Sequence, residues 1–322
     1  MNKNILLLAG VALAISGCGK YKPESVGGAR DVLVFTDCKE LIESEISFAL
    51  EKPVYTPQPE PELNVRYMVQ SDLESHLTYH GIIFAGLEED PIIKNNFPKL
   101  SANDSFALYK IEDPWAKKQK LLVFVARDTT ALLLGLKAVR EKIYETFKYQ
   151  LLERLEAMTY ESGTDAKLAK EIEKFGFKVK VPRYWLLDKS NAEERFIWIH
   201  THEPDRSIFV YWEPNERADL SRRAMIGLRD SLTRRFYQGD YLDSVFLSAG
   251  PSYFRGQNAL EIEGVWQNDS MMIGGPMKAY AFNEDGRFYM VDAMLFYPAA
   301  PKKKLFWLNQ LEVVIATFEP LK

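Results

Sequence analysis

The stretch Asn258-Ala-Leu-Glu-Ile-Glu-Gly-Val-Trp-Gln267 decides the fold expected for the second half of this chain. Within it, Leu260 and Ile262 alternate with Glu261 and Glu263. Successive side chains of a strand point to opposite faces, so the alternation predicts a strand with one apolar face and one carboxylate face. Such strands are typical of antiparallel sheets that pack against a core.

The surrounding sequence predicts the same order of elements twice, three strands followed by a helix. The predicted elements are strands 177–182, 195–202 and 207–213 with a helix over 219–238, then strands 258–267, 278–283 and 287–297 with a helix over 303–318. Two such units predict an antiparallel sheet with helices against one face. Because the two units share their order and not their sequence, a duplicated β-β-β-α unit is one interpretation of the pattern.

The first half of the chain is predicted to form a mixed α/β domain. Apolar patterning predicts strands over 31–36, 63–69, 106–111 and 120–126 and a helix over 38–51. Three prolines within 57–61 predict a segment without regular structure.

The longest periodic segment of the sequence runs from Thr129 to Met158. Its apolar residues recur at steps of three and four, at Leu132, Leu136, Val139, Ile143, Phe147, Leu151, Leu155 and Met158. This spacing predicts a single stripe on one long helix, or on two helices with a small break.

Turn-forming residues at Tyr160–Asp165 mark the best candidate boundary between domains. We therefore expect an α+β protein of two mixed domains, residues 29–162 and 163–322, preceded by a signal peptide (1–17) and a flexible tether (18–28). The C-terminal domain is expected to be an antiparallel sheet covered by helices.

The first eighteen residues resemble a bacterial lipoprotein signal peptide. Lys3 precedes the apolar run Ile5–Ile15, and Ile15-Ser-Gly-Cys18 resembles the lipobox that ends in the acylated cysteine. A membrane span needs about 20 apolar residues, so this run is too short to be one. The resemblance implies a Gram-negative-type envelope lipoprotein, anchored by acyl chains such as palmitate on Cys18. No acidic cluster follows Cys18, which favours the periplasmic face, and we expect the outer rather than the inner membrane.

Composition excludes several classes of protein. A hydrophobic fraction of 47% excludes a disordered chain, and a net charge of −4 does not favour binding of nucleic acid by bulk charge. Once Cys18 carries lipid, Cys38 is the single remaining cysteine, so we expect no intramolecular disulfide. The simplest interpretation of Cys38 is a small buried hydrophobic residue.

Four stretches together resemble the bacterial lipoprotein family called domain of unknown function 4837. They are 57–61 (PQPEP), 113–120 (DPWAKKQK), 263–267 (EGVWQ) with 274–276 (GGP), and 296–298 (FYP) with 311–317 (LEVVIAT). The chain departs from the family at Met277, where phenylalanine is usual, and at Lys302–Lys304, where arginine is favoured. The resemblance implies class and location but no activity.

The four histidines form two pairs with metal-ligand spacing. His76 and His80 share a face if 73–80 is helical, and His200 and His202 share a face if 195–202 is a strand. Neither pair has the context of a known zinc motif, so histidines at the ends of surface elements are the favoured interpretation.

Two groups of charged residues are further candidates. Glu261 and Glu263 could act as acid and base in glycoside hydrolysis, although a solvated strand face paired with a basic neighbour is favoured. Several arginines crowd the helix over 219–238, among them Arg222 and Arg229. They could bind lipid headgroups or sugar phosphates, or pair with acidic residues along the same helix.

The most favoured function is non-enzymatic. No P-loop, nucleophile elbow, dinucleotide fingerprint or zinc ribbon occurs in the sequence, so we expect no cofactor, and an enzyme is the less favoured interpretation. Trp198, Trp212 and Trp266 lie on predicted strands as candidate stacking residues, with Trp212 more typical of core. We expect an envelope binding or assembly factor with a protein or glycan partner, and a hydrolase of envelope polymers or glycans is the alternative.

A Cys18→Ala variant is expected to be released into the soluble fraction, because it lacks the atom that carries the acyl chains. The measurement is fractionation of cells without detergent, and Cys38→Ala is the matched control. A Cys18→Ala protein that stays with the membranes through washing would contradict lipidation.

Overall fold

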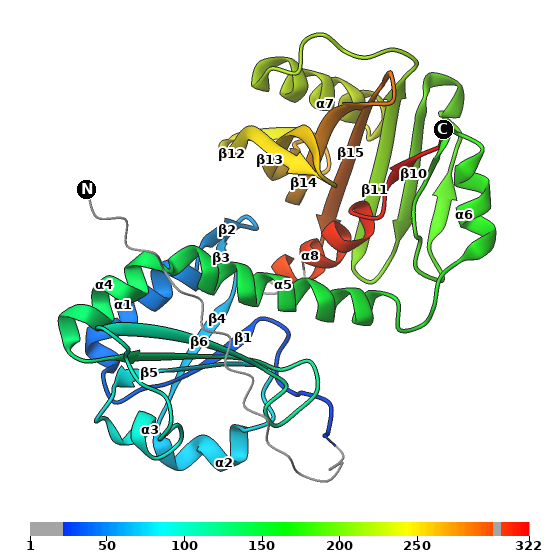
Figure 1. Cartoon of the computed structure of the whole chain (residues 1–322). Helices are drawn as coiled ribbons and strands as arrows, with labels where there is room; N and C mark the ends of the chain where they lie inside the picture. Colours follow the sequence, from blue (N-terminus) through cyan, green and yellow to red (C-terminus); the bar gives the residue numbers. More distant parts are fainter. Residues whose placement is uncertain (1–21, 299–303, 322) are drawn as a thin grey trace. The chain divides into compact units, whose positions relative to one another are not determined.

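A computed structural model of the chain describes residues 22–298 and 304–321 (Figure 1). Cys18 and the signal peptide lie outside the described residues. The contacts divide the chain into two compact units, one of which runs up to Pro53 and continues over Pro61–Glu153. The other combines Val54–Glu60 with the chain from Arg154 onward. No helix among the described residues is long and apolar enough to cross a membrane.

The first unit is built on a five-stranded sheet with the order β4-β1-β5-β7-β6. Its first four members are parallel and β6 pairs antiparallel with β7. The strands are β1 (Asp31–Phe35), β4 (Asn64–Met68), β5 (Gly81–Leu87), β6 (Phe106–Glu112) and β7 (Lys120–Ala126). The four strands predicted for this half are present.

The central strand β5 is the one that the sequence analysis missed. It pairs with β1 on one side and β7 on the other, and Ile82–Ala85 are fully buried. β5 shares its continuous apolar pattern with the predicted strands β1 and β7, and periodicity alone does not distinguish such a short run from a segment of buried helix.

Helices cover both faces of this sheet (Figure 1). α1 (Lys39–Leu50), α4 (Thr129–Ala138) and α5 (Arg140–Thr159) lie on one face, and α2 (Leu73–His76) and α3 (Pro91–Lys94) on the other. The stripe predicted over 129–158 is buried from Leu132 to Leu155, whereas Met158 is exposed. The helix breaks at Val139, so the two-helix alternative is correct.

The second unit is built on a seven-stranded antiparallel sheet with the order β12-β13-β14-β15-β11-β10-β9. Its strands are β9 (Leu186–Asp188), β10 (Phe196–Thr201), β11 (Asp205–Glu213), β12 (Tyr241–Phe254), β13 (Gln257–Asn268), β14 (Ile273–Glu284) and β15 (Arg287–Phe296). The short strand β8 (Phe177–Lys178) pairs with β16 (Glu319–Pro320) outside this sheet. The expected α+β class, with helices on an antiparallel sheet, is confirmed.

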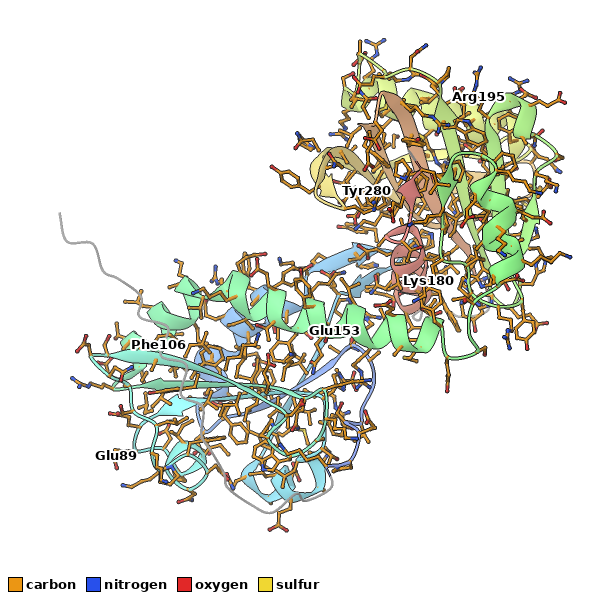
Figure 2. The ribbon with its side chains drawn as sticks, turned by 45° about the vertical axis from the view of Figure 1, so that its right-hand side comes forward. Glu89, Phe106, Glu153, Lys180, Arg195 and Tyr280 are labelled. Carbon is orange, nitrogen blue, oxygen red and sulfur yellow. The ribbon has the colours of Figure 1, made fainter. Side chains whose placement is uncertain are left out.

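Helices pack on both faces of this sheet, so the expectation of helices against one face is wrong. Phe288 and Met290 of β15 pack in one core with α7 (Arg222–Phe236). Tyr289 and Val291 pack in a second core with α8 (Lys304–Ile315) and α6 (Ala166–Glu173). Tyr280 of β14, labelled in Figure 2, also belongs to the α8 side. β15 carries apolar side chains on both faces and therefore needs a cover on each.

The arrangement does not support a duplicated β-β-β-α unit. If the two halves of the sheet were duplicates, a two-fold axis perpendicular to the sheet would exchange them, because their strands are antiparallel. Such an axis would place α7 and α8 on the same face, whereas they lie on opposite faces. The second half also contains an extra strand, β12, which the sequence analysis did not predict. β12 is an edge strand with many exposed residues, among them Val245 at 78% exposure, so its apolar alternation is weak.

The proline-rich segment is not without regular structure. β2 (Pro53–Tyr55) and β3 (Pro59–Pro61) form a short two-stranded sheet. Within the second unit, the Glu60 carboxylate accepts hydrogen bonds from the backbone N–H groups of Lys304 (2.9 Å) and Leu305 (3.0 Å). A carboxylate at this position satisfies free N–H groups at the start of α8 and complements the helix dipole.

A buried ion pair ties α7 to the sheet. Arg229 of α7 and Asp292 of β15 are both 0% exposed, and Arg229 Nε donates to Asp292 Oδ2 at 3.1 Å. Burial raises the pKa of Asp292 to about 6, although Arg229 opposes the shift. Each of these charges is stable inside the core because the other is present.

An Arg229→Met variant is expected to lower the free energy of unfolding by about 3–5 kcal/mol, because it leaves Asp292 buried without its counter-charge. Arg229→Met with Asp292→Leu is expected to recover much of the loss. Urea unfolding of both variants tests this, with Arg222→Met at the exposed start of α7 as the control. Equal stability of Arg229→Met and wild type would contradict the role of the pair.

Glycine at position 275 gives Trp266 its place in the sheet. A Cβ on Gly275 would lie 1.9 Å from the Leu295 carbonyl oxygen and 3.3 Å from Trp266 Nε1. That same carbonyl accepts a hydrogen bond from the indole N–H of Trp266 at 3.3 Å. The motif residues Trp266 and Gly275 are direct partners in the β13–β14 register.

Gly275→Ala is therefore expected to displace the Trp266 indole and to destabilise the second unit by about 1–3 kcal/mol through overpacking. Tryptophan fluorescence and urea unfolding measure the two effects. Gly250→Ala on β12 is the matched control, because nothing lies within 4 Å of its Cβ position. Identical behaviour of the two variants would show that Gly275 has no such role.

Candidate functional site

A cavity of about 330 Å³ lies in the second unit on the sheet face that carries α7. α7 ends at Phe236, and the chain turns away through Tyr237 and two residues of positive φ, Gln238 and Gly239, before β12 begins. Because the helix ends there, it leaves part of the apolar sheet face without a helical cover. The cavity occupies this part, and its volume is typical of small-molecule sites.

Aromatic rings form most of the wall of the cavity. Trp198 and His200 of β10 stack with ring centroids 4.2 Å apart, and the ring of Tyr237 meets Trp198 edge-on at 5.2 Å. Trp266, Phe236, Phe296 and Met294 complete the apolar lining. Rings placed in this way offer flat apolar surfaces to a ligand.

Three polar atoms in this wall are buried without a hydrogen-bond partner among the described residues. They are the indole Nε1 of Trp198, Nδ1 of His200 and the hydroxyl of Tyr237. Burial, followed by the charge of Asp292, raises the pKa of Tyr237 well above its ordinary value, and burial together with His202 lowers the pKa of His200. Both groups are therefore neutral near pH 7, and an unpaired buried polar group of this kind points to a missing partner.

The charged groups at the cavity already have partners. His202 Nδ1 lies 2.6 Å from Asp205 Oδ1, and Asp240 Oδ1 accepts from the Asn268 amide at 2.8 Å. The Arg206 guanidinium lies over the ring of Trp307 at 4.6 Å and donates to Gln310. Of these groups only His202 and Asp205 pair with each other, whereas the partners of Arg206 and Asp240 are uncharged and Arg206 Nε is buried without a hydrogen-bond partner among the described residues.

The structure does not assemble the histidine pairs into a metal site. The helix predicted over 73–80 ends at His76, and the Nδ1 atoms of His76 and His80 lie 2.8 and 2.9 Å from the carbonyl oxygens of Asp72 and Val26. His200 and His202 line the cavity, but no cluster of three metal-ligating side chains occurs among the described residues.

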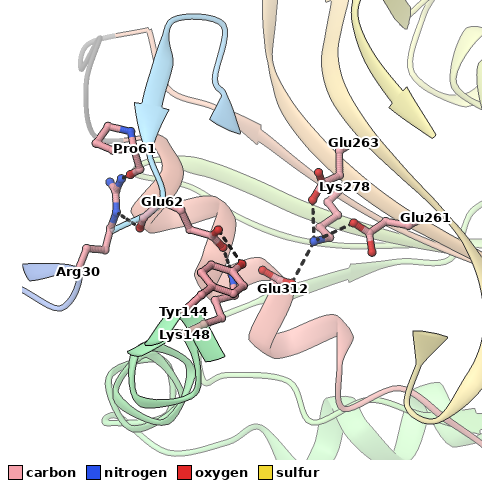
Figure 3. Close-up of polar contacts among 9 residues, drawn as sticks. All are labelled: Arg30, Pro61, Glu62, Tyr144, Lys148, Glu261, Glu263, Lys278 and Glu312. Carbon is pink, nitrogen blue, oxygen red and sulfur yellow. Dashed lines mark hydrogen bonds and ion pairs between the residues drawn. The ribbon is translucent and has the colours of Figure 1, made fainter. Parts of the chain in front are cut away.

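The carboxylates Glu261 and Glu263 lie on the α8 side of the sheet, away from this cavity. Lys278 Nζ is 3.3 Å from Glu261, 2.7 Å from Glu263 and 3.1 Å from Glu312 of α8 (Figure 3). Burial alone would lower the pKa of Lys278, but the surrounding carboxylates raise it well above its ordinary value. Both glutamates thus pair with a basic neighbour on the next strand, and this geometry gives no support to acid–base hydrolysis.

The two arginines nominated for anion binding have different environments. Arg229 cannot contact an external anion, because it is buried against Asp292, and this nomination is wrong. Arg222 is exposed at the start of α7 and its guanidinium lies 3.5 Å from the Leu247 carbonyl oxygen.

The tryptophans divide between core and cavity. Trp212 is buried in the α8-side core with Phe177 and Tyr289. Trp198 and Trp266 both line the cavity, although they are far apart in sequence. The sequence analysis did not nominate Phe236 and Tyr237, which lie at the end of α7. It selected only arginines from the predicted helix.

Cys38 is half-buried, and its Sγ lies 3.3 Å from Asp90 Oδ2. Burial and this carboxylate raise the pKa of the thiol to about 12, so it stays protonated near pH 7. A protonated thiol is a poor nucleophile, which agrees with a structural role.

Two family models match the chain, and each covers one half. The model described as domain of unknown function DUF4837 matches residues 165–317, and that of DUF8532 matches residues 25–160. The resemblance to the first family is thus confirmed in the C-terminal half. The stretches 57–61 and 113–120 lie outside its match and inside that of the second family. No curated protein matches the chain in sequence.

Several solved structures are similar to part of the chain, with low identity and low TM-scores. Cyanobacterial PsbP (CyanoP) from Synechocystis sp. PCC 6803 is 16% identical, with a TM-score of 0.33, over 46% of this chain and 88% of its own. LpqN of Mycobacterium tuberculosis, titled as involved in cell envelope biogenesis, is 10% identical with a TM-score of 0.30, over 45% and 83%. A protein from Bacteroides thetaiotaomicron VPI-5482 is 10% identical with a TM-score of 0.29, over 46% of each chain.

The lining of the cavity, from Trp198 to Phe296, lies within the matched residues 165–317. This part of the chain matches the model of the DUF4837 family.

Proposed function

We propose that this chain is a lipid-anchored protein of the cell envelope whose C-terminal unit binds a neutral glycan in the cavity beside the end of α7. The observation that carries the proposal is the set of three unpartnered polar atoms, on Trp198, His200 and Tyr237, in an aromatic wall. Burial of a polar group without a partner costs about 1–3 kcal/mol, which a ligand would offset once the rings of the wall move enough to expose these atoms to it.

A sugar ring matches both parts of this wall. Its C–H faces pack on aromatic rings such as Trp198, and its hydroxyl groups both donate and accept hydrogen bonds. The indole Nε1–H can only donate, so its partner must be an acceptor oxygen. The Tyr237 hydroxyl and the neutral His200 ring can each donate a hydrogen bond to a sugar hydroxyl or accept one from it.

The charges around the cavity favour a neutral ligand. An anion would require a basic side chain that is free to face it, whereas the Arg206 guanidinium lies over the Trp307 ring and donates to Gln310 of α8. A cation would require a free carboxylate, whereas Asp205 and Asp240 are both engaged. Leaving a ligand charge unpaired in a half-enclosed site is costly, so uncharged sugars are preferred.

The membrane anchor in this proposal rests on the lipobox-like sequence that ends at Cys18. Two or three acyl chains, at about 0.8 kcal/mol per buried CH₂, would hold the protein at the membrane permanently. Envelope glycans would then lie within reach of a tethered binding unit. A hydrolase is not proposed, because Glu261 and Glu263 pair with Lys278 on the other face of the sheet.

Trp198→Ala is expected to lower glycan affinity at least tenfold and Tyr237→Phe several-fold, since they remove the stacking surface and one hydrogen-bonding group. The measurement is calorimetric titration of the full-length protein in detergent with tetramers of N-acetylglucosamine, mannose and galactose. Tyr253→Ala, an exposed aromatic on β12, is the control.

The proposal would be overturned if no tetramer binds the wild-type protein. It would also be overturned if Trp198→Ala binds with wild-type affinity, because the ligand would then lie elsewhere. Capture of a protein partner that depends on Trp198 would support binding of an aromatic or apolar side chain in place of a sugar.

A further inference from the structure

We infer that the glycan site has a second subsite on the other side of Trp266, so that the ligand is an oligosaccharide of at least two rings. This inference rests on the proposed function and extends it. Its basis is a second cavity of about 390 Å³ that shares Trp266 and Ile273 with the first. Two cavities with a common wall can hold neighbouring rings of one chain.

The common wall is rigid. Trp266 is 4% exposed, and its indole N–H is fixed on the Leu295 carbonyl oxygen at 3.3 Å. Gly275 provides the space for this bond, because a Cβ there would collide with the same carbonyl. A fixed partition keeps the two cavities at a constant spacing, as recognition of a repeating polymer requires.

An irregularity of the edge strand opens the second cavity. The pairing of β12 with β13 shifts between Leu242 and Leu247, and the residues in this interval leave the regular ladder. Asp243 and Phe246 from this interval line the cavity. Bulges of this kind re-aim side chains at sheet edges and often occur beside binding sites.

The second cavity is more polar than the first and offers mainly acceptor oxygens. The Tyr241 hydroxyl lies 2.9 Å from each carboxylate oxygen of Asp269 and donates its hydrogen bond to this carboxylate. The same hydroxyl accepts a hydrogen bond from the Gln267 side-chain amide at 2.7 Å. Asp243, Asn268 and Asp269 line the cavity. Carboxylates with further lone pairs suit the hydroxyl or amide N–H donors of a second sugar ring.

The turn between β13 and β14 spans both cavities. Met271 lines the first cavity and Met272, which is 91% exposed, lines the second. The Asn268 side chain holds the turn by accepting from the Met271 backbone N–H at 3.0 Å. Unbranched thioether side chains adapt to the shape of a ligand, so this pair can close over rings in both cavities.

The test uses the one-, two- and four-ring forms of N-acetylglucosamine, mannose and galactose with the full-length protein. In the series that binds, affinity is expected to rise at least tenfold from one ring to two. Asp269→Ala is expected to lower affinity for the two- and four-ring forms at least threefold and to leave the one-ring form unchanged. Trp198→Ala is expected to lower affinity for all three forms, and Glu216→Gln, an exposed carboxylate outside both cavities, is the control.

Equal affinity for one and four rings, or wild-type binding of the four-ring form by Asp269→Ala, would overturn the second subsite and leave the proposed function intact. If no form of any sugar binds, the proposed function fails and the second subsite fails with it. A loss of one-ring affinity in Asp269→Ala would also overturn the inference, since the two cavities would then not act as separate subsites.

Discussion

The burial of β15 on both of its faces is the constraint on which the C-terminal unit depends. Apolar side chains alternate to opposite sides along this strand, so each side of the sheet must be covered. α8 and α6 cover one side, and α7 covers the other. The one charged side chain in the middle of the strand, Asp292, is neutralised by Arg229 of α7, which fixes where that helix lies.

The cavity forms because α7 is too short to cover its whole face of the sheet. α7 ends at Phe236, and the sheet face beyond it has aromatic side chains from β10, β13 and β15 but no helix over them. The same sequence feature that stops the helix, a turn through Gln238 and Gly239, therefore also creates the site.

Charge pairing separates structure from function in this protein. Lys278 with its three glutamates, and Arg229 with Asp292, form ion pairs within the fold. The aromatic groups at the cavity that lack a hydrogen-bond partner among the described residues, on Trp198, His200 and Tyr237, are uncharged. Of the candidates nominated from the sequence, Trp198, Trp266, His200 and His202 line the cavity, whereas the charged residues Glu261, Glu263 and Arg229 pair within the fold.

The sequence by itself determined the α+β class, most strands, and the apolar stripe from Leu132 to Leu155 on either one helix or two. These features depend on local periodicity. It did not predict β5, although its apolar run is like those of the predicted strands β1 and β7, or β12, whose exposed edge position weakens its alternation. Only the tertiary structure decided that Trp198, Tyr237 and Trp266 share one cavity and that Glu261 and Glu263 do not. Such groupings depend on strand order and helix length across long sequence separations, which no local pattern records.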